Sequence, residues 1–231
     1  MHRFIIQTIS LTTLLFSSAI LAAQGGGNAA PRYVPEDNRP PLAFREDFID
    51  EPTETPVTMA SINNKELRFT LWGPGKDLVA KSWHASPKDE SGYIWTGSCT
   101  QVCGFTLYRP GYYLDLRELA KVTWRTKQTG FHQLRLMLKL ADGQILVSDK
   151  TVGASRDWQV SEMPIADIQW YQLHTETMTD YPAVQNPDLS KVAEIGWTDL
   201  IPGSGHGTPG GSTRVDWIEV YGRLVPQNDA R

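Results

Sequence analysis

The sequence predicts an all-β protein, built as an antiparallel sandwich or barrel. Short runs alternate between apolar and polar residues, as the residues of half-buried strands do. Clusters of Gly, Pro, Asn and Asp separate these runs and supply turn chemistry between them. No segment after the N-terminal leader shows the apolar period of a helix longer than two turns. About ten short strands joined in this way form a sandwich or barrel.

The first half of the chain is expected to form five short strands. The best defined is Leu-Arg-Phe-Thr-Leu-Trp at 67–72, which alternates and is broken by Gly73-Pro74-Gly75. The five strands are expected at 67–72, 78–83, 93–96, 105–108 and 112–114, with one helical turn at 115–119.

The stretch 122–149 holds three strand-like runs, separated by turn signals at Thr129-Gly130 and Ala141-Asp142-Gly143. In the first run, Arg125 and Lys127 alternate with apolar residues. In the second, Arg135 and Lys139 alternate with leucines. If these runs pair as hairpins, one sheet face carries all four cations. Such a face suits an anionic or hydroxyl-rich ligand, although a solvated outer face explains the same pattern.

The rest of the domain adds four strands and two loops. We expect strands at 158–163, 168–174, 193–200 and 214–224, and loops at 178–187 and 202–212. Period-two alternation predicts which side chains lie between the sheets. This expected core contains Trp124, Leu136, Leu138, Leu140, Trp170, Ile195, Trp217 and Val220.

The N-terminus reads as an export signal. Met1-His2-Arg3 is a basic start, 4–22 is mostly apolar, and Ala22-Ala23 offers a cleavage site. Cleavage after Gly25 and an uncleaved membrane anchor are the alternatives. The predicted organisation is a signal peptide at 1–23, a linker at 24–42, a domain at 43–226 and a tail at 227–231. We therefore expect a secreted or periplasmic protein with no membrane span after cleavage.

The two cysteines, Cys99 and Cys103, are expected to form a disulfide outside the cytoplasm. Four residues of extended strand would hold their Cα atoms too far apart, so the pairing predicts a turn at 100–102.

The charge balance makes nucleic acid an unfavourable partner. The whole chain has a formal charge of −4, and removal of residues 1–23 takes away Arg3 and no acidic residue. The remaining 21 basic and 26 acidic residues give a charge of −5.

The order of segments in the second half resembles the galactose-binding-like β-jelly roll of secreted carbohydrate-binding modules. The resemblance rests on Leu-Lys-Leu-Ala-Asp-Gly at 138–143, Asp-Leu-Ser-Lys-Val at 188–192, Ile195-Gly196, and Asp-Trp-Ile-Glu-Val-Tyr-Gly at 216–222. It implies a two-sheet antiparallel jelly-roll sandwich that binds a polysaccharide or oligosaccharide. It also implies a structural calcium between the first and last strands, for which Glu46, Asp47 and Asp216 occupy the matching positions.

The expected function is non-catalytic binding of a polysaccharide, which the cations would make an anionic one. Indole rings stack on the apolar faces of sugars. The expected ligand-binding residues are Arg125, Lys127, Arg135, Lys139, Trp83, Trp95 and Trp197. A protein that recognises another protein in the cell envelope is a third reading.

The alternative is a small polysaccharide-degrading enzyme on the same scaffold. A lyase would combine one of the cations with a base, for which His84, Tyr93 and His206 are the candidates. A glycoside hydrolase would need two opposed carboxylates. Those available are Asp142, Asp149, Glu194 and Asp199.

Overall fold

The computed structural model describes residues 39–48, 53–83, 92–202 and 213–227. The described chain is all-β, apart from three short 3-10 turns: η2 (Met59–Ser61), η3 (Lys76–Leu78) and η5 (Ile165–Asp167). Two antiparallel sheets face each other across one large hydrophobic core. The predicted fold class, a two-sheet antiparallel sandwich of the jelly-roll type, is therefore confirmed.

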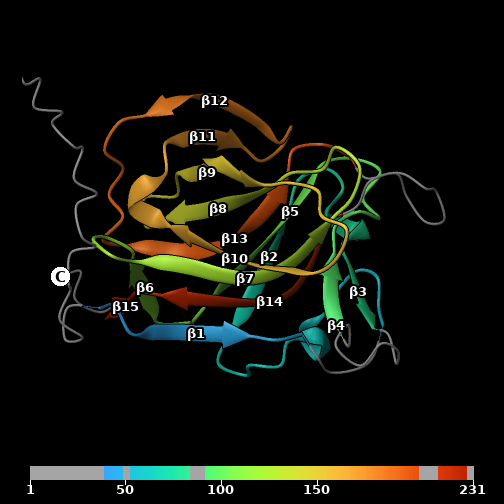
Figure 1. Cartoon of the computed structure of the whole chain (residues 1–231). Helices are drawn as coiled ribbons and strands as arrows, with labels where there is room; N and C mark the ends of the chain where they lie inside the picture. The colour runs from blue at the N-terminus through green and yellow to red at the C-terminus, as the bar shows by residue number, and fades with distance from the viewer. Residues whose placement is uncertain (1–38, 49–52, 84–91, 203–212, 228–231) are drawn as a thin grey trace, which may run out of the picture. The chain divides into compact units, whose positions relative to one another are not determined.

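The first sheet, sheet A, has the strand order β10-β7-β14-β4-β3, and β1 also pairs with β14. In Figure 1 its strands β7, β14 and β1 follow one another below β13. The bounds are β1 (Leu42–Glu46), β3 (Ala80–Trp83), β4 (Gly92–Trp95), β7 (Lys121–Gln128), β10 (Gln159–Pro164) and β14 (Thr213–Tyr221).

The second sheet, sheet B, has the order β12-β11-β9-β8-β13-β5-β2, and β6 joins β13 to β15. Figure 1 shows β12, β11, β9, β8 and β13 in succession from the top. The bounds are β2 (Arg68–Trp72), β5 (Cys103–Tyr108), β6 (Tyr112–Asp115), β8 (Leu134–Leu140), β9 (Ile145–Val152), β11 (Trp170–His174), β12 (Thr179–Val184), β13 (Val192–Asp199) and β15 (Arg223–Pro226).

Three local predictions were wrong. The loop expected at 178–187 contains β12, which tolerates Pro182 because β12 is an edge strand of sheet B. The strand expected at 214–224 is divided at Gly222, where the chain passes from β14 in sheet A to β15 in sheet B. A side chain at Gly222 would collide with Leu116, because an added Cβ would lie 2.8 Å from its Cδ2. The helical turn expected at 115–119 is a turn closed by the Ala120 N–H and the Arg117 carbonyl.

The four cations do not share one sheet face, which corrects the central expectation from the sequence. β7 pairs with β10 and β14 in sheet A, whereas β8 pairs with β9 and β13 in sheet B. The short connection at 129–133 therefore crosses from one sheet to the other. Arg125 and Lys127 lie on sheet A, and Arg135 and Lys139 lie on sheet B.

The core confirms most of the predicted faces. Trp124, Leu136, Leu138, Ile195 and Val220 have no exposed surface, and Leu140 and Trp170 are also buried. Trp217 was wrongly placed in the core. The irregular pairing between Val215 and Trp217 in β14 turns this indole outward, where the Arg45 guanidinium lies 4.5 Å from the centre of its ring.

Trp197 was wrongly placed at the ligand surface. It belongs to β13, between β5 and β8 in the middle of sheet B, and is fully buried. Its ring stacks on that of Phe105 at a centroid distance of 4.8 Å. The position on a central strand explains the error, because the inner face of such a strand has no access to solvent.

The predicted disulfide between Cys99 and Cys103 is present, with the two Cα atoms 6.3 Å apart. The chain bends at residues 100–101 between the two cysteines, as the pairing requires, and both residues are buried in the main core. The bridge ties the segment before β5 to this core.

Several sequence predictions lie outside the described residues. They are the signal peptide at 1–23, most of the linker at 24–42, and the histidines His84 and His206. Within the described ranges, no helix has the length and hydrophobicity needed to cross a bilayer.

Candidate functional site on the outer face of sheet B

On the outer face of sheet A, Arg125 and Lys127 already form ion pairs with carboxylates, and Arg125 also contacts an aromatic ring. Arg125 binds Asp216 and lies 5.1 Å from the ring centre of Trp158. Lys127 lies 3.7 Å from a carboxylate oxygen of Asp157. The positive charge of Arg125 and Lys127 is therefore balanced within the protein.

Asp216 gives this face a pH dependence. Its side chain is buried, and burial raises the pKa of its carboxyl to about 6, although the hydrogen bond and charge of Arg125 lower it. The ordinary pKa of the carboxyl is 3.8. Between these two values the folded state binds more protons than the unfolded chain, so Asp216 contributes more stability as the pH falls.

We expect the wild type to gain stability relative to an Asp216→Asn variant as the pH is lowered from about 7 to about 5. The asparagine does not titrate, so the difference between the two Tm values isolates the carboxyl. Thermal unfolding of both proteins across this range measures it. A difference that stays constant, or that moves in favour of the variant at low pH, would contradict the assignment.

The three carboxylates expected to bind calcium do not fit a shared calcium site. Glu46 is buried and accepts backbone N–H groups of Phe48, Asn63 and Asn64 at 2.9–3.0 Å. Asp47 is paired with Arg45, and Asp216 is paired with Arg125. Throughout the described segments, no three His, Cys, Asp or Glu side chains form a group that could hold a metal ion.

We therefore expect that calcium does not stabilise the domain through these carboxylates. The Tm in excess calcium and the Tm in EDTA should agree to within about 1 °C, because a ligand that does not bind the native state cannot shift its stability. A rise of several degrees with calcium, lost in a Glu46→Gln variant, would restore the original prediction.

On the outer face of sheet B, the side chain of Met178 reaches from the β11–β12 edge toward the opposite edge of the sheet. Met178 lies between β11 and β12, yet it packs beside Gly73 at the end of β2 and Gly104 in β5. A Cβ added to Gly104 would lie 3.2 Å from the Met178 methyl carbon. Four strands separate β2 from β11 in the sheet order, so the β11–β12 connection reaches back across the outer face of sheet B.

A second hydrophobic cluster lies on this outer face. Its buried members are Met137, Val147, Leu173 and Met178, and Trp72 and Tyr171 pack against it. Arg135 holds the β11–β12 hairpin over the cluster. Its guanidinium donates to the Ser148 carbonyl at 2.6 Å and to the Asp180 carboxylate at 2.8 Å.

Beside this cluster, a chain of hydrogen bonds crosses β2, β5, β13 and β8. The Trp72 indole N–H donates to the Thr106 hydroxyl at 2.7 Å, and that hydroxyl donates to Glu194 at 2.6 Å. The Lys139 ammonium donates to the other oxygen of Glu194 at 2.8 Å. It also lies 5.5 Å from the ring centre of Trp72. We call these four residues the Trp72 network.

The Trp72 network combines a fixed ring with polar groups. Thr106 and Glu194 are buried, whereas Trp72 is half-buried and the Lys139 side chain keeps 34% of its surface exposed. The indole is oriented through its N–H and through the second cluster, so little conformational freedom remains to be lost when a ligand binds. Such a ring beside a hydrogen-bond donor can hold a sugar.

Of the predicted ligand-binding residues, only Lys139 belongs to the Trp72 network. Arg135 lies on the same sheet and holds the hairpin, whereas Trp83 and Trp95 are half-buried at the ends of β3 and β4 in sheet A. Tyr93, a predicted base, is also on sheet A. It is buried there, with its ring 5.7 Å from that of Trp158.

Sequence reasoning missed Trp72 and Thr106, and it considered Glu194 only as one carboxylate among several. Trp72 was predicted as the last residue of a strand before Gly73-Pro74-Gly75. That pattern gives the position of the residue in the fold but says nothing of its role. Thr106 and Glu194 are 88 residues apart, so no local spacing could join them.

No protein-family model matches the sequence, and no curated protein matches it. The fold can be compared with solved structures. It resembles family 11 carbohydrate-binding modules. The module of a cellulosomal cellulase from Clostridium thermocellum is 16% identical, with a TM-score of 0.40, over 80% of this chain and 95% of that one.

Enzymes appear among the similar structures as well. An exo-β-agarase is 12% identical, with a TM-score of 0.39, over 72% of this chain and 24% of that one. A putative β-glucanase from Mycobacterium abscessus is 14% identical, with a TM-score of 0.33, over 78% of this chain and all of that one.

Proposed function

We propose that this protein binds a neutral polysaccharide, without cleaving it, on the outer face of sheet B beside Trp72. The observation that carries the proposal is the fixed and half-buried Trp72 indole. A sugar ring presents an apolar C–H face for stacking and hydroxyls that need donors and acceptors. Lys139 supplies a donor beside the ring, and the buried Glu194 carboxylate orients Lys139 directly and the indole through Thr106.

A neutral ligand suits the charges better than the anionic one suggested by the sequence. The four cations lie on two sheets, and acids neutralise them. Lys139 shares its charge with Glu194, so it serves as a hydrogen-bond donor more than as a site for an anion.

Binding is also favoured over the enzyme alternatives. Glu194 already accepts hydrogen bonds from Thr106 and Lys139, which leaves it poorly placed to act as a free acid or nucleophile. A lyase base at Tyr93 would be on the sheet opposite Arg135 and Lys139. Export through the leader at 1–23 remains part of the proposal, and the disulfide is typical of an oxidising compartment.

The proposal is tested by retention on immobilised polysaccharides: cellulose, mixed-linked β-glucan, laminarin and agarose as neutral glycans, with pectate and a sulfated galactan as anionic ones. We expect retention on at least one neutral glycan, with no release of reducing ends and no unsaturated uronate. Retention should not weaken with added salt, because salt screens only charge attraction. Retention confined to the anionic glycans and lost in salt would contradict the neutral-ligand proposal, and product release would favour the enzyme.

A further inference from the structure

A separate cleft lies where the two sheets meet, between β9 of sheet B and β10, the edge strand of sheet A. Its volume is about 370 Å³, which is within the range of small-molecule sites in proteins. The connection from β9 to β10 begins at one end of the cleft, and η5 lies beside the other. These boundaries favour a short ligand over a polymer threaded through the cleft.

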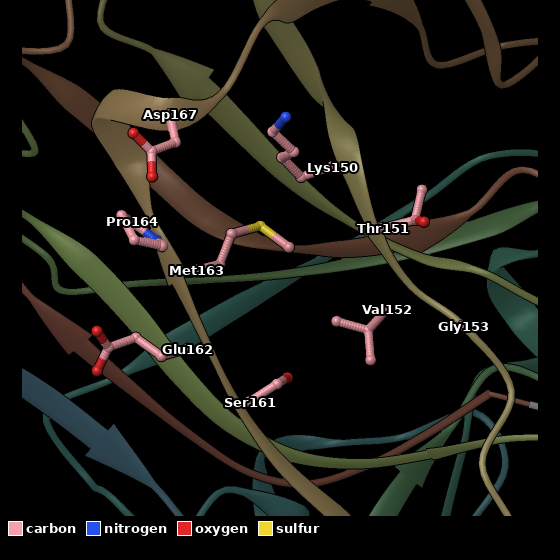
Figure 2. A pocket seen from close by; sticks show the side chains of 9 residues that line it. All are labelled: Lys150, Thr151, Val152, Gly153, Ser161, Glu162, Met163, Pro164 and Asp167. Atoms are coloured by element: carbon pink, nitrogen blue, oxygen red, sulfur yellow. The ribbon is translucent and has the colours of Figure 1, made fainter. Parts of the chain in front are cut away.

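The cleft has an apolar floor and a mixed polar rim. The Met163 side chain, which is buried, lies between the two strands with Val152 facing it (Figure 2). In Figure 2, Lys150 and Asp167 lie in the upper part of the view, and Ser161 lies in the lower part. A ligand that fills this space meets carbon below it and hydrogen-bonding groups around it.

The rim offers both donors and acceptors that protein partners leave available. Lys150 is exposed, and its ammonium lies 3.5 Å from Asp149, a loose ion pair that leaves donors for a ligand. Among the described residues, no cation lies within ion-pair distance of Asp167. The Ser161 hydroxyl accepts the Trp124 indole N–H and can still donate its own proton.

We infer that this cleft is a second ligand site, for a neutral saccharide of one or two rings. The apolar face of the ring packs on Met163 and Val152. Adjacent hydroxyls bind Lys150 as donor and Asp167 as acceptor, a pairing that a single charged group cannot provide. The same chemistry is found in a free sugar and at the end of a polysaccharide.

Gly153 is the position at which a substitution can narrow the cleft. It lines the cleft, and a Cβ added to it meets no atom within 4 Å. A Gly153→Phe variant therefore adds a large ring at the cleft lining with no clash at its Cβ, and Gly153→Ala is its matched control. An Asp167→Ala variant removes the acceptor alone.

The test is a titration of the whole chain followed by the NMR shifts of the backbone amides of Lys150–Gly153 and Ser161–Met163. The probes are glucose, galactose, cellobiose and lactose, with glycerol as a polyol that has no ring face. We expect at least one sugar to shift these amides and glycerol not to. Gly153→Phe should abolish the effect, Gly153→Ala should keep it, and Asp167→Ala should weaken it roughly tenfold.

A longer oligosaccharide distinguishes the two possible ligands, a free sugar and the end of a polysaccharide. If a hexasaccharide shifts the same amides, the cleft takes a chain end, and if it does not, the cleft takes a free sugar. The absence of sugar-dependent shifts at these amides would overturn the inference, as would equal shifts with glycerol. The Trp72→Ala variant should bind sugar in this cleft as the wild type does, so the proposals for the cleft and for the Trp72 site can fail independently.

Discussion

Replacing Trp72 by alanine is expected to reduce affinity for the retained neutral glycan at least 30-fold, or about 2 kcal/mol, because the ring is the central stacking surface of the proposed site. The measurement is calorimetric titration with an oligosaccharide of that glycan, at a temperature where both proteins are folded. A Trp72→Phe variant keeps a ring but loses the hydrogen bond to Thr106, so it should fall between the two.

The matched control is Trp83→Ala, since Trp83 is also half-buried at the end of a strand but belongs to sheet A. It should bind as the wild type does. The reverse result, with binding lost in Trp83→Ala and kept in Trp72→Ala, would indicate that the ligand binds on sheet A.

Replacing Leu138 by alanine should cost about 2–5 kcal/mol of folding free energy, because the side chain is fully buried between the sheets and its removal leaves a cavity. Chemical denaturation at constant temperature measures the loss as a lower midpoint with an unchanged slope. The affinity for glycan at low temperature should not change, because Leu138 faces away from Trp72.

Val160 provides the surface control for this experiment. It lies on the edge strand β10 with 62% of its surface exposed. Val160→Ala should change the folding free energy by no more than about 0.5 kcal/mol. Equal effects of the two substitutions would mean that the leucines of β8 do not form the centre of the core.

The features that depend on local pattern were predictable from the sequence. The alternation of β8 placed its leucines inward and Arg135 and Lys139 outward, as the structure has them. The separation of only four residues between the two cysteines also predicted the bend that the disulfide requires. In both cases the cause lies within a few residues of chain, where geometry leaves little choice.

The features that depend on strand order were not predictable. The connection at 129–133 has the composition of a hairpin turn, and the same composition serves a crossing between sheets. The strands β13 and β14 were predicted, but the burial of their tryptophans was not. The central position of β13 buries Trp197, and the irregular pairing of β14 turns Trp217 outward. The Trp72 network draws residues from four strands, so it exists only once the whole sheet is assembled.

The most direct test of the proposed function is the indole N–H resonance of Trp72 during titration with the oligosaccharide that binds. The Trp72→Phe variant assigns this resonance by its loss. We predict that it shifts in proportion to occupancy, because its hydrogen bond to Thr106 lies beneath the bound sugar. The indole resonances of Trp83 and Trp217 in sheet A, and of Trp158 beside Arg125 of that sheet, should stay in place. Saturating ligand that shifts these three resonances and leaves that of Trp72 unchanged would contradict a binding site on the outer face of sheet B.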